Sequence, residues 1–477
     1  MLVGRKKEQA VLRNLLEEEE PQFCAVYGRR RVGKTYLIRE TFNYQFAFQH
    51  TGYANAPMAR QLSGFRDSLQ AASGKRYRLP RSWFEAFRLL EDVLSENTDR
   101  KKVVFLDELS WMDTPRSNFV SALAHFWNNW ATARREKDIV LIVCGSSTSW
   151  ITKKVFRNRG GLYGRLTERI YLSPFSLSEC ENFAQVAGLN MSRKEIAEAY
   201  MTLGGVPYYW SLLDRRFSLA QNIDRLFFGR DGKLRNEYRE LYASLFDNEE
   251  PYLAIVEALG EKRKGLTRHE LQTALGEKSS GTLSTRLDEL EMSDFVRGYR
   301  CMGKKERDTM YQLIDPFTLF HFSFVKTSKG TGTNFWTSKI ESATHNTWAG
   351  LAFERLCFWH TAQIKQALGI SGIACSFYSW TYIPKAGGEE GAQIDMLIDR
   401  NDKVINLCEM KYSDSEYAVT DDEYKRLCRR RSVFANASKT HKAVHYTLVT
   451  TYGLKRAAND DIFNQTVTLD DLFREIS

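Results

Sequence analysis

The sequence predicts an α/β protein of several domains, and three observations point to this class. Near the start, a glycine-rich phosphate-loop pattern stands between an apolar stretch and a helical pattern. A second apolar stretch in the same region ends in two adjacent acids, and two strand-like runs near residue 400 flank a polar turn. A chain of 477 residues is long enough for about three domains of ordinary size.

Composition narrows the class of protein further. With 43% hydrophobic and 27% charged residues the chain is globular, and its longest apolar runs fall far short of the ~18 residues of a membrane helix. The N-terminal segment lacks the apolar core of a signal peptide, so we predict no membrane contact. Eight cysteines without a Cys-x-x-Cys pair favour reduced thiols in a cytoplasmic protein. A net charge of +9 favours a polyanionic partner.

Residues 23–38 predict a strand, a loop and a helix that bind ATP. The loop matches G-x-x-x-x-G-K-[ST] completely and consists of Gly28, Arg29, Arg30, Arg31, Val32, Gly33, Lys34 and Thr35. The glycines let backbone N–H groups surround the phosphates, Lys34 reaches the terminal phosphates, and Thr35 holds Mg²⁺. The alternative, a plain turn rich in glycine and arginine, fits the flanking strand and helix patterns less well.

A second apolar strand supports the ATP site. Residues 101–113 predict a strand that ends in Asp107 and Glu108. In this interpretation Asp107 binds Mg²⁺ together with Thr35, and Glu108 polarises the attacking water. Acid pairs at strand ends are common, but an acid pair together with a phosphate loop is typical of an ATP site.

Two further groups are candidates for the ATP site. The apolar strand 139–150 ends in serines, of which Ser146 or Ser147 orients the water or senses the γ-phosphate; a helix N-cap is the alternative. Arg165 lies in a glycine-flanked turn and is a candidate arginine finger, which would place the site between copies of the chain in a homo-oligomer. Arg169 competes for that role, and an ordinary surface arginine is the alternative.

The ordered series of these motifs resembles the archaeal-type AAA+ ATPases related to the STAND signalling NTPases. The segments are LVGRKKEQAVLRNLL, YGRRRVGKTYLI, FLDELSWM, IVCGSSTSW, LYGR and LGGVPYYW, between residues 2 and 210. The resemblance implies a P-loop ASCE/AAA+ ATPase core over 1–175 and a helical lid over 176–235. It also implies that Gly204, Gly205 and Pro207 lie near the nucleotide, and that Val3, Gly4 and Arg5 lie near the adenine.

Residues 236–325 resemble a winged helix-turn-helix. Two amphipathic helices fall within 251–276, with Thr267 as N-cap and Gly276 as stop, and a third helix precedes a hairpin with a Gly-Lys-Lys turn. DNA contacts would come from the third helix and the wing, through Ser284, Arg286, Lys304, Lys305 and Arg307. Because residues 251–326 hold 11 acids against 12 bases, a purely structural coupler is the alternative.

Residues 393–412 predict a strand hairpin around Asn401 and Asp402. Folding the hairpin there places Asp395 opposite Cys408 or Glu409, and side-chain alternation puts Glu409 and Lys411 on one face. Two carboxylates bind a hard divalent ion such as Mg²⁺, and a lysine beside it positions a metal-bound water. The spacing alone is weak, because acidic surface hairpins are frequent.

The surroundings of this hairpin resemble the PD-(D/E)xK nuclease superfamily. A helix over 346–369 carries Glu354, and a basic helix over 421–434 follows the hairpin. The resemblance covers 346–477, after a linker over 326–345, and implies a restriction-endonuclease-like α/β domain. It implies Mg²⁺ on Asp395 and Glu409, Lys411 in catalysis and Glu354 as an auxiliary ligand. Ile394 stands where the superfamily name has proline, and the region has no net basic charge, so an inactive fold kept for interaction is the alternative.

These parts together predict an ATP-controlled, Mg²⁺-dependent nuclease that acts on DNA, with defence against foreign DNA as one use. The first alternative is an ATP-dependent switch or DNA-binding regulator with a non-catalytic nuclease-like domain. A second alternative is an ATPase ring that remodels partners, in which Arg165 reaches a neighbouring subunit.

Overall fold

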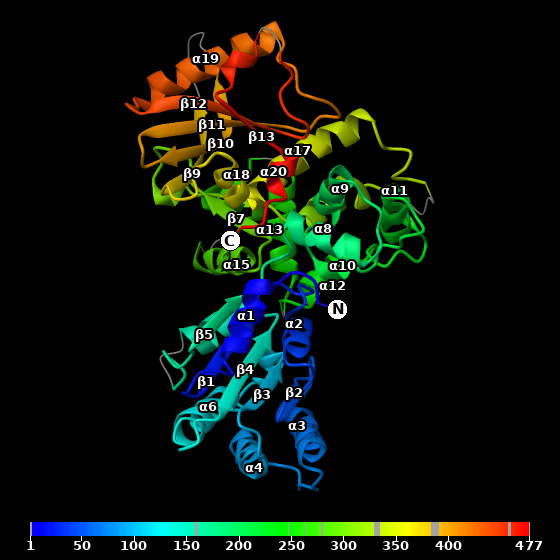
Figure 1. Cartoon of the computed structure of the whole chain (residues 1–477), viewed down its shortest axis with the longest axis vertical. Helices are drawn as coiled ribbons and strands as arrows, with labels where there is room; N and C mark the ends of the chain where they lie inside the picture. The colour runs from blue at the N-terminus through cyan, green and yellow to red at the C-terminus, as the bar shows by residue number, and fades with distance from the viewer. Residues whose placement is uncertain are drawn as a thin grey trace. The chain divides into compact units, whose positions relative to one another are not determined.

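The computed structural model describes residues 2–157, 161–246, 248–262, 264–277, 280–328, 334–382, 391–456 and 459–476. The chain forms two compact units, Met1–Pro174 and Phe175–Ser477, and each is described by itself (Figure 1). Within the described ranges, no helix combines the length and apolar character needed to cross a bilayer.

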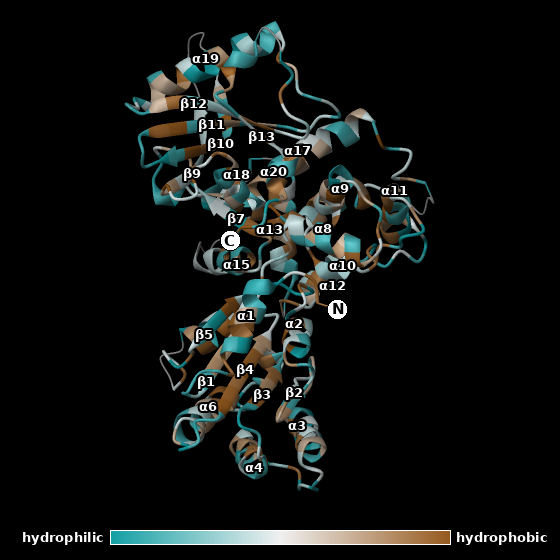
Figure 2. Cartoon of the chain, in the orientation of Figure 1, coloured by the Kyte–Doolittle hydropathy of each residue, from teal (hydrophilic) through white to brown (hydrophobic). Residues whose placement is uncertain are grey.

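The first unit is built on a parallel five-stranded sheet with the order β2-β3-β4-β1-β5. Its strands are β1 (Gln22–Tyr27), β2 (Phe48–Thr51), β3 (Lys102–Asp107), β4 (Ile139–Gly145) and β5 (Glu168–Tyr171). Every residue of β3 and β4 is buried, and the central strands are among the most hydrophobic parts of the unit in Figure 2. Continuous apolar strands of this kind are expected where helices cover both faces of a parallel sheet.

Side-chain alternation along the strands divides the core of the first unit in two. On β1, Cys24 and Val26 face α1 (Lys6–Asn14) and α2 (Lys34–Thr41), whereas Phe23 and Ala25 face the other helices. The other face of the sheet packs against a larger set of elements: α3 (Met58–Ser73), α4 (Trp83–Glu96), α5 (Leu109–Met112), α6 (Phe119–His125), α7 (Thr148–Ile151), and the π-helical turns η1 (Phe126–Ala131) and η2 (Thr152–Phe156).

The second unit begins with helices and a small antiparallel sheet. The sheet has the order β6-β8-β7, with β6 (Leu266–Thr267), β7 (Val296–Tyr299) and β8 (Met310–Leu313). Thr267 caps the following helix through a capping box with Glu270, and Gly276 ends it in the left-handed conformation, as predicted. The helices are α8 (Leu177–Val186), α9 (Arg193–Leu203), α10 (Pro207–Trp210), α11 (Leu219–Ile223), η3 (Asp224–Phe228), α12 (Glu237–Ala243), α13 (Glu250–Gly260), α14 (Arg268–Leu275), α15 (Ser280–Met292), η4 (Glu306–Asp308), α16 (Pro316–Phe320) and η5 (His321–Val325).

The C-terminal part contains a mixed five-stranded sheet with the order β13-β12-β11-β10-β9. Strands β9 (Cys375–Tyr382), β10 (Ala392–Arg400) and β11 (Val404–Lys411) are antiparallel neighbours, and β12 (Ala443–Thr450) and β13 (Gln465–Thr468) continue it in parallel. Helices α17 (Ala343–Trp359), α18 (Thr361–Ala367) and α20 (Leu469–Leu472) share a core with one face of the sheet, and α19 (Asp421–Ser438) packs on the other; η6 (Asp460–Ile462) precedes β13.

One hydrophobic core runs through the whole second unit. It joins the helices after Pro174, the small sheet, the aromatic segment around Phe320, and one face of the C-terminal sheet. Trp336, within the predicted linker 326–345, is buried in this core, and its backbone N–H donates to Asp224 at 2.6 Å. Part of that linker is therefore packed structure; residues 329–333 lie outside the described residues.

The helix predicted over 346–369 is divided in two at His360. The backbone N–H of Leu177 donates to Nε2 of the His360 ring at 3.1 Å, so Nδ1 carries the proton and donates to Leu356 O at 2.8 Å. The ring is buried, and burial lowers its pKa to about 4. Sequence periodicity does not reveal this break, and the ring at the break contacts a residue 183 positions away.

This histidine predicts acid sensitivity of the fold. Because the folded-state pKa lies below the unfolded value of about 6.5, its stabilisation is fully present above pH 6.5 and is lost as the pH falls toward 4. We expect His360 to account for a loss of about 2 kcal/mol in unfolding free energy between pH 7 and pH 5. Urea unfolding at both pH values, on the wild type and on His360→Gln, measures it. An equal pH dependence in the two proteins would contradict the assignment.

Candidate functional site

The phosphate-loop residues lie between β1 and α2, where the first unit positions them by backbone geometry. Gly28 has φ +142°, and a Cβ there would lie 2.4 Å from the carbonyl oxygen of Leu172. No other residue fits without moving the backbone. Gly33, with φ +89°, directs the chain into α2. The loop therefore reaches a helix N-terminus, whose free N–H groups favour an anion.

Lys34 is the first residue of α2 and is buried. Its amine donates to the carbonyl oxygens of Gly28 at 2.9 Å and Arg29 at 2.8 Å, so it crosses its own loop. Burial lowers the pKa of the Lys34 amine, and the nearby carboxylates of Glu108 and Asp107 oppose that effect. A cation held in this position offers its remaining hydrogen-bonding capacity to a phosphate oxygen.

Thr35 and Asp107 meet although 72 positions separate them. The Thr35 hydroxyl lies 3.1 Å and 3.0 Å from the two carboxylate oxygens of Asp107, which ends β3. A hydroxyl and a carboxylate at hydrogen-bonding distance are hard oxygen ligands and fit a Mg²⁺ ion that also binds phosphates. Thr35 and Asp107 would hold this ion, which would neutralise charge on the phosphates.

Glu108 is held in a specific orientation beside Asp107. Its backbone adopts the left-handed conformation, with φ 49°, which is costly for a residue other than glycine. One carboxylate oxygen accepts hydrogen bonds from Ser146 N at 3.2 Å and Ser146 Oγ at 2.9 Å. Ser146 thus binds Glu108, and it is Ser147 that takes the N-cap position of α7, without a side-chain hydrogen bond. If Ser146 orients the water or senses the phosphate, as predicted, it would do so through Glu108.

The two candidate arginine fingers differ in their surroundings. Arg169 lies on β5 with its guanidinium 4.5 Å from the centre of the Phe156 ring, so it is engaged within its own unit. Arg165 is exposed in the turn before β5. Both arginines are exposed, so the ring contact of Arg169 is what favours Arg165, whose role between subunits stays a prediction.

The residues that the resemblance places near the nucleotide fall in both units. Arg5, in the first unit, is buried and donates to Ser173 O at 2.6 Å. Gly204, Gly205 and Pro207 lie in the second unit between α9 and α10, and Gly205 O accepts from Phe175 N at 2.6 Å. A Cβ on Gly205 would lie 2.0 Å from Phe175 O, so close packing against the backbone of Phe175 requires a glycine at this position.

The structure brings together two of the four predicted nuclease residues. Glu354 of α17 and Asp395 of β10 line one small cavity of about 20 Å³, enough for about one water molecule. A bulge in the pairing of β9 with β10 falls between Ile394 and Leu397, and bulges re-aim side chains. Asp395 accepts a hydrogen bond from Gln393 at 2.5 Å.

Glu409 and Lys411 lie on one face of β11, as predicted, but a residue of α19 also engages Glu409. The hairpin register, Met396 with Cys408, sets Asp395 beside Glu409, as expected. However, Glu409 binds Arg430 of α19 at 2.6 Å and Lys411 at 3.0 Å. Burial raises the pKa of Glu409, but Arg430 and Lys411 outweigh burial and hold that pKa below its usual range.

This arrangement does not form the predicted Mg²⁺ site. Among the described residues, no group of three or more His, Cys, Asp or Glu side chains is placed to hold a metal ion. The physical reason is that two cationic side chains satisfy Glu409, while Glu354 and Asp395 face a cavity that also contains Arg297 and Arg355. The predicted carboxylates therefore do not fit a divalent ion in this state.

The residues predicted to contact DNA differ in their exposure. Lys304 and Lys305 are exposed in the turn between β7 and β8, as a wing requires. Arg286 on α15, in contrast, is only 21% exposed and forms an ion pair with Glu277 at 2.5 Å. The Glu277 carboxylate thus offsets the charge of Arg286, and a DNA contact by Arg286 stays a prediction.

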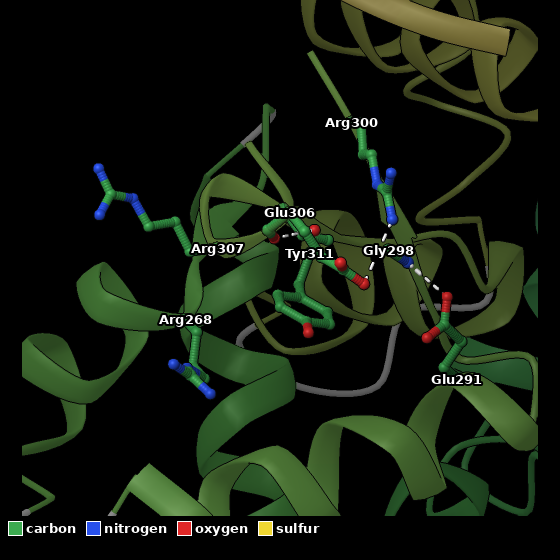
Figure 3. Close-up of a pocket in the computed structure, with 8 residues that line it drawn as sticks. Arg268, Glu291, Gly298, Arg300, Glu306, Arg307 and Tyr311 are labelled. Atoms are coloured by element: carbon green, nitrogen blue, oxygen red, sulfur yellow. Dashed lines mark hydrogen bonds and ion pairs between the residues drawn. The ribbon is translucent and has the colours of Figure 1, made fainter. Parts of the chain in front are cut away.

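A pocket of about 400 Å³ beside the predicted wing was not found from the sequence (Figure 3). Its lining includes Arg268, Arg300, Arg307 and Tyr311. Arg300 is paired with Glu306 at 3.3 Å, while Arg268 and Arg307 lie on the side opposite to Glu291 in the view. The balanced charge of this region does not reveal that three arginines gather at one pocket. Of the three, only Arg307 was predicted from the sequence, as a wing residue that contacts DNA.

Comparison with known proteins bears on the first unit above all. Residues 2–213 match the model of a family described as an ATPase domain predominantly from Archaea. An uncharacterized protein of Methanocaldococcus jannaschii, MJECL04, is 23% identical over 436 residues, which is 90% of this chain and 92% of that one.

Among solved structures, the Walker-type ATPase Paby2304 of Pyrococcus abyssi superposes with a TM-score of 0.50 at 18% identity, covering 67% of this chain and 95% of that one. The ORC2 protein of Aeropyrum pernix, in ADPNP and ADP complexes, gives a TM-score of 0.41 at 15% identity, covering 72% and 96%. The first of these supports the fold, an α/β P-loop ATPase with a parallel sheet. Together with the family match over residues 2–213, it supports an ATPase of the archaeal type in the N-terminal part of this chain.

Proposed function

We propose that this chain is an AAA+ ATPase in which ATP turnover controls a PD-(D/E)xK-like domain acting on DNA. The observation that carries the proposal is the attachment of the predicted lid, 176–235, to the C-terminal domain. Lys194 of α9 pairs with Asp414 at 2.5 Å, and Tyr412 donates to Glu198 of the same helix at 2.6 Å. A segment that responds to nucleotide would therefore carry the C-terminal domain with it.

Topology supports the nuclease-like part of this proposal. A helix with Glu354, three antiparallel strands with Asp395 and Glu409, the helix α19 and a parallel strand follow in that order. The winged-helix interpretation has similar support, since α14, α15 and the β7–β8 hairpin follow the expected order. Mg²⁺ use at the ATP site is supported by the Thr35–Asp107 contact.

A plasmid-cutting assay with Mg²⁺, with and without ATP, tests the proposal. We expect ATP-dependent cutting by the wild type, none by Asp395→Ala or Lys411→Ala, and loss of the ATP dependence in Lys34→Ala. The exposed Lys403→Ala, in the same hairpin, and the exposed Lys6→Ala serve as matched controls and should match the wild type. Equal cutting by the wild type and Lys34→Ala would remove ATP control from the proposal.

The second candidate function is an ATP-dependent switch whose nuclease-like domain does not cut. The ion pairs of Glu409 with Arg430 and Lys411 favour this candidate, because they occupy the carboxylate that a metal would need. ATP hydrolysis and DNA binding without any cutting by the wild type, under all metal conditions, would select it.

DNA binding is expected to use the pocket beside the wing. Replacing Arg268 and Arg307 together with alanine removes two phosphate-binding cations, so we expect weaker binding to all sequences and a shallower salt dependence, by about one unit per lost phosphate contact. Fluorescence anisotropy at several salt concentrations measures both effects. Arg286→Ala is the control, since its charge is already paired. Weakening by Arg286→Ala alone would instead place the contact on α15.

A further inference from the structure

The left-handed backbone of Glu108 needs support from its surroundings. Its φ of 49° and ψ of 52° are costly for a residue with a side chain, and such a conformation persists only where the surrounding structure enforces it. Trp111 N closes the turn after it by donating to Glu108 O at 3.0 Å. The turn continues as α5, which has only four residues and is marginal by itself. Contacts from other elements must therefore hold this turn, which we call the Glu108 turn (residues 108–112).

The loop after β2 packs directly on the Glu108 turn. Gly52 N donates to Asp107 O at 3.0 Å, which extends the pairing of β2 with β3 beyond the last residue of β2. A Cβ on Gly52 would lie 2.9 Å from Glu108 O and 3.3 Å from the Trp111 side chain. Because a side chain has no room there, glycine lets the loop approach the backbone of Glu108.

Gln61, in the first turn of α3, joins the loop to the Glu108 turn by hydrogen bonds. Its Oε1 accepts from Tyr53 N at 3.0 Å, and its Nε2 donates to Tyr53 O at 2.6 Å and to Trp111 O at 2.9 Å. Nε2 also lies 3.4 Å from Ala56 O. The bond from Tyr53 N identifies the oxygen end of the amide, so the nitrogen end faces the carbonyls. The side chain is fully buried, which makes the loss of these bonds costly.

Packing fixes the same loop to α3, which lies beside β2 (Figure 1). A Cβ on Gly64 of α3 would lie 2.2 Å from the Tyr53 ring, so the ring rests on the helix backbone. Leu62 and Phe65 of α3 share a buried core with Leu109 of α5. The loop and α3 therefore give the Glu108 turn a rigid support.

We propose that Gln61 and Gly52 are positioning residues for ATP hydrolysis, which hold Glu108 in the conformation that polarises the attacking water. Both act through the backbone of the Glu108 turn. The proposal rests on ATP hydrolysis at this site and is independent of the nuclease-like domain. Reaction rates depend steeply on geometry, and a displacement of about 1 Å costs up to about 10²-fold.

Gln61→Met tests the proposal, because methionine is similar in size but cannot donate to Trp111 O. The matched control is Gln70→Met on the same helix, where Gln70 accepts from Tyr77 N in a different loop at 3.2 Å. Phosphate release gives kcat and KM, and fluorescent-nucleotide titration gives the dissociation constant. We expect kcat to fall about tenfold or more in Gln61→Met at unchanged nucleotide affinity, and to stay at the wild-type value in Gln70→Met.

Combination with Glu108→Gln separates positioning from a general loss of structure. Where the charge that polarises the water is already absent, Gln61→Met should lower the hydrolysis rate by less than about twofold. Wild-type kcat in Gln61→Met would overturn the proposal. An equal loss in Gln70→Met, or a full further loss in the Glu108→Gln background, would overturn it as well. If Gln61→Met does not fold, Gly52→Ala replaces it with the same expectations, since its Cβ presses on Glu108 O.

Hydrogen exchange of the amides of residues 109–112, in the nucleotide-free protein, is the second measurement. We expect exchange about tenfold faster or more in Gln61→Met, and no change in Gln70→Met. If the wild type does not hydrolyse ATP, the ATPase function fails. Faster exchange in Gln61→Met would then still support the holding of the Glu108 turn by Gln61, and equal exchange would overturn it.

Discussion

Glu108→Gln is expected to reduce ATP hydrolysis by about 10²-fold or more while leaving ATP binding intact. Glutamine has the shape of glutamate and can still accept from Ser146 N, but it lacks the negative charge that polarises an attacking water. Phosphate release measures hydrolysis, and fluorescent-nucleotide titration measures binding. Ser146→Ala should have a smaller effect, since it removes only one of two hydrogen bonds to the Glu108 carboxylate.

The exposed Glu19→Gln, in the same unit, is the matched control and should hydrolyse ATP at the wild-type rate. Wild-type hydrolysis by Glu108→Gln would remove Glu108 from the mechanism. Loss of nucleotide binding in the same variant would instead show that Glu108 maintains the conformation of the loop. This outcome has to be distinguished from loss of catalysis, because Glu108 has a left-handed backbone.

Arg430→Met is expected to destabilise the C-terminal sheet by about 2 kcal/mol. Without Arg430, the partly buried Glu409 carboxylate keeps only Lys411 as an ion-pair partner. Breaking a buried ion pair costs about 3–5 kcal/mol when no partner remains, so the loss here is expected to be smaller. Because the folded pKa of Glu409 lies below its unfolded value, its stabilisation is present above the unfolded pKa and is lost as the pH falls through the folded one. This acid dependence should shrink in Arg430→Met.

Hydrogen exchange of β11 and α19 amides measures the change, since it reports the opening free energy of that region. Lys425→Met, exposed on the same helix, should change it by less than about 0.5 kcal/mol. Combining Arg430→Met with Glu409→Gln removes the unpaired charge and should recover most of the loss. A double variant less stable than Arg430→Met would show that Arg430 acts through packing rather than charge.

The ATP-site residues could be predicted because each of them belongs to a local pattern. The spacing of the phosphate-loop pattern identifies Lys34 and Thr35, and an apolar strand that ends in acids identifies Asp107. In a parallel sheet the strand ends gather at one edge, so the Thr35–Asp107 contact follows once both patterns are placed. The hairpin register near residue 400 followed in the same way from its turn.

What the sequence could not supply were the partners from distant elements. Alternation predicts that Glu409 and Lys411 share a strand face, but it does not reveal that Arg430 of α19 approaches that face. Charge counting likewise cannot tell that Glu277 engages Arg286, or that Arg268, Arg300 and Arg307 gather at one pocket. In each of these cases the deciding contact is tertiary, and no local periodicity encodes it.

The uninterrupted core of the second unit also determines how this protein can be taken apart or recombined. A fragment ending at residue 235, where sequence patterns place the end of the ATPase, would strip α9 and its neighbours of the apolar surface they share with α16 and α17. A fragment ending at Pro174 leaves both cores of the first unit whole. Any exchange of C-terminal parts between relatives would therefore have to transfer everything from Phe175 onward as a single module.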